Sequence, residues 1–247
     1  MKVIVGMDSF KGSLPSVDAN LAVENGIKQV FPDAVVKAFA MADGGEGTAE
    51  TLVEGMNGSL VEIAVTGPLG PLIDASYGLI KDENLAIIEV ASACGLTLLS
   101  KDQLNPLITT TYGVGELINH AFKNGARKFI IGLGGSSTND GGVGMLQAMG
   151  YEFMDVEGNE IAFGGGFLSS IDSIRKTVES EKFKDCEFRV ACDVSNLLYG
   201  AQGASYIFGP QKGADSDMLK ALDAGLKHYA DFTSKEMGIE ISNIEGG

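Results

Sequence analysis

The hydrophobic and polar positions of the first 66 residues follow two periods in turn, and these periods predict alternating strands and helices. Residues 2–8 form a short apolar run typical of a buried strand, and residues 16–31 carry apolar side chains at roughly helical spacing. Ser16 is a candidate N-cap for that helix, and Asp18 would lie favourably in its first turn. The same patterns predict strands at 34–40 and 59–66 and a helix at 48–56. Strands that alternate with helices favour a parallel sheet covered by helices.

The pattern changes at residues 67–71, where glycine and proline cluster in a turn. Two strands are then predicted at 72–80 and 84–91 around a turn at 81–84, which is an antiparallel β-hairpin. We therefore place a boundary here and expect a first lobe at 1–67 and a second lobe at 68–247.

The rest of the chain continues the mixture of helices and strands. The predicted elements are helices at 112–125, 141–149 and 216–237, strands at 128–133 and 188–193, and a short strand or hairpin at 151–161. Three glycines at 164–166 predict a flexible run. The expected fold class is α/β, with a mostly parallel sheet in the first lobe and a mixed second lobe that contains the hairpin.

Composition narrows the function classes. The chain has 247 residues, 45% of them hydrophobic, and no apolar stretch approaches the length of a membrane span, so we expect no membrane insertion. The first residues turn polar too quickly for a signal peptide. With 18 basic and 33 acidic residues the net charge is −15, which argues against a nucleic-acid partner. Three irregularly spaced cysteines give neither a disulfide framework nor a zinc pattern, and a cytoplasmic location is expected.

A glycine-rich stretch at 132–142, GLGGSSTNDGG, follows a predicted strand and precedes a predicted helix. Exposed backbone N–H groups and a helix N-terminus can together hold an anion, most often a phosphate. The residues expected to surround the phosphate oxygens are Gly134, Gly135, Ser136, Ser137, Thr138 and Asn139. Asp140, together with Asn139, could instead hold Mg²⁺ or the reacting hydroxyl. The competing interpretation is an ordinary tight turn.

Three further polar loops follow predicted strands, and ligands of open α/β sheets collect at the carboxyl ends of strands. Lys11, beside a glycine and two serines, suits phosphate contact but could equally be a solvated surface lysine. Asp43 and Glu46 lie among glycines and could bind Mg²⁺, or could cap the following helix. Asp193 directly follows a strand and is a candidate catalytic group, and Lys212 is a candidate contact for phosphate or carboxylate.

Several well-known signatures are missing from the sequence. It contains no G-x-x-x-x-G-K-[S/T], no G-x-G-x-x-G, no G-x-S-x-G and no H-E-x-x-H. Trp is absent and aromatic residues make up 7%. This argues against a glycosidase, because such enzymes usually stack sugars on aromatic side chains. The residues by themselves therefore indicate an acidic α/β enzyme that binds a phosphorylated or anionic small molecule.

At these loops the sequence resembles the bacterial type of the glycerate kinase family. The stretches that carry the resemblance are DSFKGSL at 8–14, MADGGEGT at 41–48, EVASACGL at 89–96, GLGGSSTNDGGVGML at 132–146, CDVSNLLYGAQGAS at 192–205 and FGPQKGA at 208–214. The resemblance implies ATP-dependent phosphorylation of D-glycerate to 2-phosphoglycerate or 3-phosphoglycerate, with Mg²⁺. It also implies two α/β lobes, one of them Rossmann- or flavodoxin-like. Members of that family are longer, so we expect this chain to be C-terminally truncated and its first lobe to lack strands.

Phosphoryl transfer depends mostly on positioning and charge stabilisation, and the candidate residues can be given roles on that basis. Lys11 and Lys212 would neutralise phosphate or carboxylate oxygens. Asp43, Glu46 and Asp140 would hold the metal, and Asp43, Asp140 and Asp193 are candidates for contact with the attacking hydroxyl, with Asp193 the preferred base. Two alternatives stay open, a sugar-acid lyase or isomerase that works without ATP and a non-catalytic ligand-binding fragment. A homodimer is also considered, although no sequence feature supports it.

Overall fold

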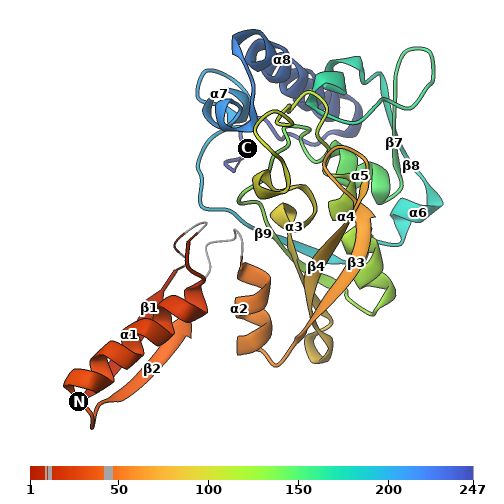
Figure 1. Ribbon diagram of the computed structural model, residues 1–247. Coiled ribbons are helices and arrows are strands. Elements are labelled where there is room, and N and C mark those ends of the chain that lie inside the picture. Colours follow the sequence, from red (N-terminus) through yellow and green to blue (C-terminus); the bar gives the residue numbers. More distant parts are fainter. Residues whose placement is uncertain (9, 11–12, 42–46, 247) are drawn as a thin grey trace.

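The structure, a computed structural model, describes residues 1–8, 10, 13–41 and 47–246, and Figure 1 shows its elements. The strands are β1 (Lys2–Met7), β2 (Val35–Ala40), β3 (Ser59–Thr66), β4 (Leu72–Ile80), β5 (Leu85–Glu89), β6 (Lys128–Gly132), β7 (Tyr151–Met154), β8 (Ser173–Lys176) and β9 (Glu187–Ala191). The α-helices are α1 (Ser16–Val30), α2 (Thr48–Gly55), α3 (Val90–Cys94), α4 (Tyr112–Lys123), α5 (Val143–Ala148), α6 (Val178–Glu181), α7 (Ala204–Phe208) and α8 (Ser216–Phe232). The predicted α/β class is confirmed.

The first three elements, β1, α1 and β2, form what we call the N-terminal unit, which Figure 1 shows beside the rest of the molecule. β1 and β2 pair in parallel, as predicted, with Lys2 opposite Val35. Two buried polar side chains of α1 hold the end of β1. The Ser16 hydroxyl donates to the Met7 carbonyl at 2.7 Å, and the Asn20 side-chain oxygen accepts from the Met7 N–H at 3.0 Å. These bonds fix the point at which the chain leaves β1.

A five-stranded mixed sheet, in the order β3-β4-β5-β6-β9, forms the centre of the rest of the molecule. β4 and β5 are antiparallel around the short helical turn Lys81–Glu83, so the predicted hairpin is confirmed. β5, β6 and β9 are parallel to one another. Their three carboxyl ends therefore open at the same edge of the sheet.

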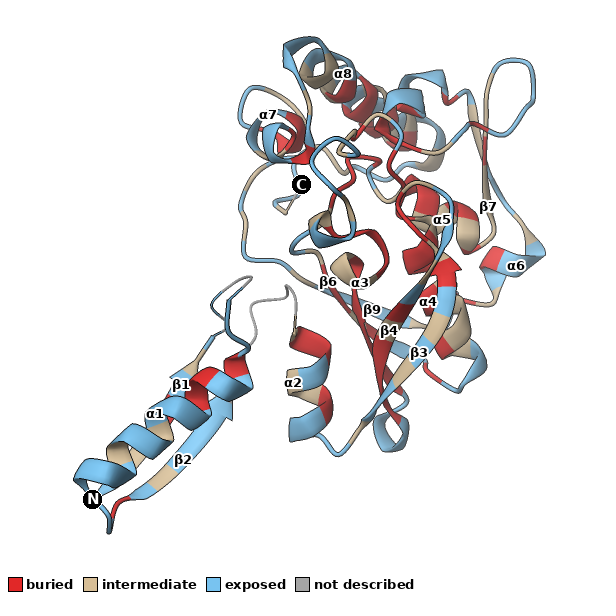
Figure 2. Ribbon diagram, in the orientation of Figure 1, coloured by how far each residue is buried: buried red, intermediate tan, exposed pale blue. Residues whose placement is uncertain are grey.

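Helices cover the two faces of this sheet unequally. On one face α4 contributes Val114, Leu117 and Ile118 to the largest apolar core, in which all three side chains are fully buried. On the other face α2 packs Ala49 and Val53 against side chains of β4 and β5. Figure 2 shows burial concentrated along β4, β6 and α4, whereas the N-terminal unit is largely exposed.

The pairing of β3 differs from the expectation that residues 59–66 belong with the first lobe. β3 is antiparallel to β4 along its whole length, from Ser59 opposite Leu79 to Thr66 opposite Leu72. The alternation of β3 resembles that of β1 and β2, so periodicity alone could not show which sheet it joins. We propose that the two units divide between β2 and α2, rather than at residues 67–71.

The middle of the chain confirms one local expectation and contradicts another. The short strand expected within 151–161 is present as β7, which pairs with β8, and an isolated bridge joins Met154 to Glu160. The glycines at 164–166 are closely packed and not a flexible run. A Cβ on Gly164 would lie 2.2 Å from the Leu107 carbonyl oxygen, and one on Gly165 would lie 2.5 Å from that of Asn139. Glycine is needed there because two backbone segments approach closely.

The last helix confirms the apolar pattern predicted at 216–237. α8 is followed by a π-helical turn, Thr233–Met237, so the helical path covers the whole predicted range. Asp215 caps α8 by accepting from the N–H groups of Asp217 and Met218, both at 2.9 Å. The buried face of α8 carries Leu222, Leu226 and Tyr229. In the described part of the chain, no helix is both long enough and apolar enough to cross a membrane.

Candidate active site

A pocket of about 500 Å³ opens where the parallel strands β5, β6 and β9 end. Glu89, Gly132 and Ala191 lie in one row across these strands, so the segments after them leave the sheet at the same level. The pocket is lined by Val90 after β5, by much of the stretch 133–142 after β6 and by 192–194 after β9. This is the edge at which open α/β sheets bind ligands.

The stretch 133–142, called the glycine-rich loop below, has an exposed part and a buried part. Gly134 and Gly135 are exposed, whereas Ser137 to Asp140 are buried. The Ser137 hydroxyl and N–H both donate to the Cys94 carbonyl at 2.8 Å, and its own carbonyl accepts from the Thr109 hydroxyl at 2.9 Å. Ser137 is thus engaged in holding the loop. Within the loop, Gly134, Gly135 and Ser136 are the residues best placed to meet a ligand.

Asp140 organises the buried part of the loop. Its Oδ2 accepts from the N–H and the hydroxyl of Thr111, both at 2.8 Å, and from the N–H of Gly144 at 3.3 Å. Its Oδ1 accepts from the Gly142 N–H at 3.1 Å. Burial raises the pKa of this carboxyl, and these hydrogen bonds oppose the shift. The carboxylate therefore joins the loop to the starts of α4 and α5.

Lys212 reaches the loop from the opposite side of the pocket. Its side chain is 8% exposed, and its Nζ donates to the Ser136 hydroxyl at 3.0 Å and to the Thr138 carbonyl at 2.5 Å. Burial lowers the pKa of Lys212 to about 8, so the ammonium remains mostly charged at neutral pH. The predicted lysine and the predicted loop thus come together, although they are more than 70 residues apart in the sequence.

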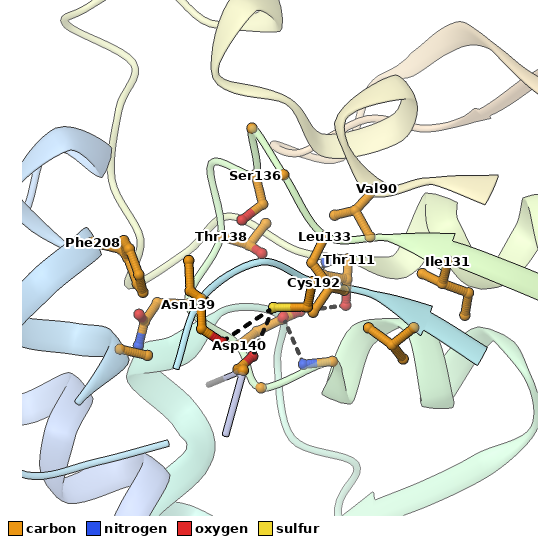
Figure 3. A pocket seen from close by; sticks show the side chains of 18 of the residues that line it. Val90, Thr111, Ile131, Leu133, Ser136, Thr138, Asn139, Asp140, Cys192 and Phe208 are labelled. Carbon is orange, nitrogen blue, oxygen red and sulfur yellow. Dashed lines mark hydrogen bonds between the residues drawn. The ribbon is translucent and has the colours of Figure 1, made fainter. Parts of the chain in front are cut away.

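Asn139 and Asp193, the other two predicted residues at this pocket, differ in their burial and hydrogen bonding. Asn139 is buried, and its amide donates to the Ser205 hydroxyl at 3.1 Å, which ties the loop to α7. Asp193 lines the pocket and is exposed, and in the described part of the chain its carboxylate makes no hydrogen bond or ion pair. Figure 3 shows Ser136, Thr138, Asn139 and Asp140 along one loop, with Phe208 on one side and Val90 and Ile131 on the other.

Lys11, Asp43 and Glu46, the other predicted site residues, lie outside the described residues, so their roles stay predictions. Among the residues that the structure describes, no three His, Cys, Asp or Glu side chains converge as metal ligands. Asp140 offers at most one lone pair of Oδ1, since its other hydrogen-bonding positions are taken. The described donors alone therefore do not make a magnesium site.

Sequence reasoning missed two groups of residues around the pocket. The three consecutive threonines 109–111 are buried, and two of them bind the glycine-rich loop. Their position directly before an amphipathic helix was a usable signal, since hydroxyl side chains concentrate at helix starts. Glu89 is the second omission. It is buried at the end of β5 and accepts from the N–H of Ala49 at 2.6 Å.

Fold and pocket together define an α/β protein with a buried ammonium and exposed glycines at the carboxyl end of a sheet. The sequence profile of the Glycerate kinase family matches residues 3–247. The chain is 48% identical over 246 residues to a glycerate kinase of Bacillus subtilis (strain 168), covering 100% of this chain and 64% of the relative. It is 46% identical over 246 residues to a glycerate 2-kinase of Escherichia coli (strain K12), covering 100% and 65%.

A solved structure gives the same result. The crystal structure of a protein assigned as glycerate kinase 2 from Salmonella typhimurium LT2 superposes with a TM-score of 0.90 at 44% identity, covering 100% of this chain and 66% of the other. The chain belongs to the glycerate kinase family, which confirms the resemblance carried by the six sequence stretches. It spans 64% and 65% of the length of the two curated relatives named above.

Proposed function

We propose that this chain carries the phosphate-binding part of an ATP-dependent kinase that phosphorylates D-glycerate. The observation that carries the proposal is the buried ammonium of Lys212, which bonds to Ser136 directly after the exposed residues Gly134 and Gly135. Backbone N–H groups and a lysine together suit the oxygens of a phosphoryl group, because both donate and neither repels the negative charge. Family membership supports glycerate as the acceptor.

The proposed roles follow from the positions of the side chains. Gly134, Gly135 and Ser136 would donate to phosphate oxygens, and Lys212 would turn part of its hydrogen bonding from Ser136 to the ligand. Thr138, Ser137 and Asn139 would keep the loop in shape, since their polar atoms already bond within the protein. Asp193 would accept the proton of the glycerate hydroxyl as that oxygen bonds to the γ-phosphorus of ATP, while the bond from this phosphorus to the bridging oxygen breaks and ADP leaves with that oxygen. Bound Mg²⁺ would neutralise phosphate charge, with Asp43, Glu46 and Oδ1 of Asp140 as proposed ligands.

The product is proposed to be 2-phosphoglycerate, because a relative 46% identical to this chain is named a glycerate 2-kinase. Incubation with D-glycerate, ATP and Mg²⁺ should release ADP only when glycerate is present, and phosphorus NMR should show phosphate on the 2-hydroxyl. A signal from 3-phosphoglycerate would correct the product alone. Turnover of sugar acids without ATP would favour the lyase or isomerase alternative, and binding without turnover would favour a ligand-binding fragment. A cytoplasmic location and a homodimer remain proposals.

In a protein preparation that phosphorylates glycerate, replacing Asp193 by asparagine should lower kcat by about 100-fold or more. The reason is that loss of a general base typically slows a reaction by that factor. The amide keeps the shape of the side chain but accepts a proton far less readily. ATP and glycerate affinities should change little, as measured by steady-state kinetics and titration calorimetry. Asp231→Asn is the matched control, since that carboxylate pairs with Lys227 on the surface of α8. An Asp193→Asn enzyme with wild-type kcat would remove Asp193 from this role.

A further inference from the structure

Glu89 is a buried carboxylate whose hydrogen bonds, among the described residues, come from backbone N–H groups at the start of α2. It ends β5 on the face of the sheet that α2 covers, and it is 6% exposed. Its Oε1 accepts from the Ala49 N–H at 2.6 Å, and its Oε2 accepts from the Gly47 N–H at 3.4 Å. Within the described residues, no lysine, arginine or histidine forms an ion pair with it.

The start of α2 depends on this carboxylate. Its N-cap residue is Gly47, at φ 90°, so the helix has no side-chain cap of its own. A serine, threonine or aspartate at that position is the usual way to satisfy the first N–H groups of a helix. Here the acceptor comes from a strand about 40 residues later in the chain. The bonds therefore join two elements and do more than complete one helix.

The arrangement costs folding free energy. Burial, together with a smaller effect of the neighbouring Glu50 on α2, raises the pKa of Glu89 to about 7, although the N–H groups of Ala49 and Gly47 act in the opposite direction. Because the folded pKa lies above that of the unfolded chain, folding is favoured while the group is protonated, and this contribution is lost as the pH rises through 7. Among the described residues no cation compensates this buried charge, and a capping group chosen only for stability would not need such a charge.

The position of Glu89 connects α2 with the pocket. Glu89 is aligned with Gly132 across β5 and β6, and the glycine-rich loop begins at the residue after Gly132. The next residue after Glu89, Val90, lines the pocket. On the other side, α2 is the first element that follows the N-terminal unit in the chain.

We propose that Glu89 is a positioning residue, which holds the start of α2 against the end of β5 and so keeps the pocket-lining segments that follow β5 and β6 in place. The part of this inference that concerns ligand binding rests on the proposed function. If Glu89 is removed, the competent arrangement is less populated, and the apparent affinity for ligand falls by the same fraction. A saturating ligand restores that arrangement, so kcat should recover.

The test compares Glu89→Gln with Glu116→Gln in the 247-residue chain. Glu116 is a matched control, because its carboxylate also accepts a backbone N–H, that of Thr66 at 2.6 Å, and it is not among the pocket-lining residues. Hydrogen exchange read by mass spectrometry should show peptides of 47–51 exchanging about tenfold faster in Glu89→Gln only, since local opening sets the rate there. The Tm at pH 8 should not fall.

Ligand binding supplies the second measurement. The Kd for ATP with Mg²⁺, and the KM wherever turnover is seen, should rise about tenfold in Glu89→Gln, with kcat within about twofold of wild type. Unchanged exchange at 47–51 would overturn the proposal, and so would faster exchange with unchanged affinity. If the unmodified chain binds no nucleotide, the proposed function fails, while the exchange data still decide whether Glu89 holds α2. Glu89→Asp, which keeps the charge but shortens its reach, replaces Glu89→Gln if the latter does not fold.

Discussion

Replacing Lys212 by methionine should weaken the binding of ATP by about 100-fold, because a buried charge-assisted contact to phosphate contributes roughly 1.5–3 kcal/mol. Methionine has a similar length and fills the space between Ser136 and the Thr138 carbonyl without a charge. The folded state should survive, since burial already disfavours the ammonium, as the lowered pKa indicates. Titration calorimetry with ATP and Mg²⁺ measures the effect, and circular dichroism checks the fold.

The matched control for this variant is Lys220→Met. Lys220 is exposed on α8 and pairs with Asp217 at 2.9 Å, so its loss should leave nucleotide affinity within about twofold, as is usual for surface ion pairs. The lowered pKa adds a pH test. Affinity in the unmodified protein should decline as the pH rises through 8, because the ammonium then loses its proton. Lys212→Met should show no such decline. Wild-type affinity in Lys212→Met would exclude Lys212 from the phosphate site.

Replacing Asp140 by asparagine should lower the free energy of unfolding by about 3 kcal/mol, because several donors lose a charged, buried acceptor at once. The carboxylate now accepts four hydrogen bonds, from the Thr111 hydroxyl and three backbone N–H groups. An amide offers one oxygen for these donors and turns its own N–H₂ towards the rest. Urea unfolding at pH 7 followed by circular dichroism gives the change directly.

Asp223→Asn is the graded comparison for Asp140→Asn. Asp223 accepts a single backbone bond, from the Gly200 N–H at 2.7 Å, and its replacement should cost about 1 kcal/mol. A loss of stability for Asp140→Asn no larger than that of Asp223→Asn would contradict the organising role. If stability is unchanged and only the affinity for Mg²⁺ falls, then Asp140 acts as a metal ligand instead.

The local sequence pattern was sufficient to locate those helices and strands whose structure depends mainly on their own residues. The period of 3.6 residues located α4 and α8, and alternating and apolar runs located β1, β4 and β6. The glycine-rich loop was recognised because glycine, hydroxyl and acidic residues between a strand and a helix have few other uses. Such signals are local, because they depend on which side of one helix or strand is buried.

The same patterns do not show which strand pairs with which, or which groups a side chain contacts. The sequence pattern predicts β3 as a further strand of the first lobe, but β3 forms its hydrogen bonds with β4. Ser137 and Ser136 look equivalent in sequence, but one is fully buried beneath Cys94 and the other meets Lys212. The role of Glu89 was not predicted, because nothing in the sequence around a glutamate at the end of an apolar strand indicates that it will bond to α2.

The sequence by itself therefore determined the α/β class, the family and the positions of the loops that carry polar side chains, because these depend on local periodicity and on motifs of adjacent residues. Only the tertiary structure decided which loop residues face the pocket, that Lys212 lies against the glycine-rich loop, and that Asp140 and Glu89 are bound by backbone N–H groups. The physical reason is that burial and hydrogen-bond partners are properties of segments far apart in the chain, brought together only when the sheet and its helices pack.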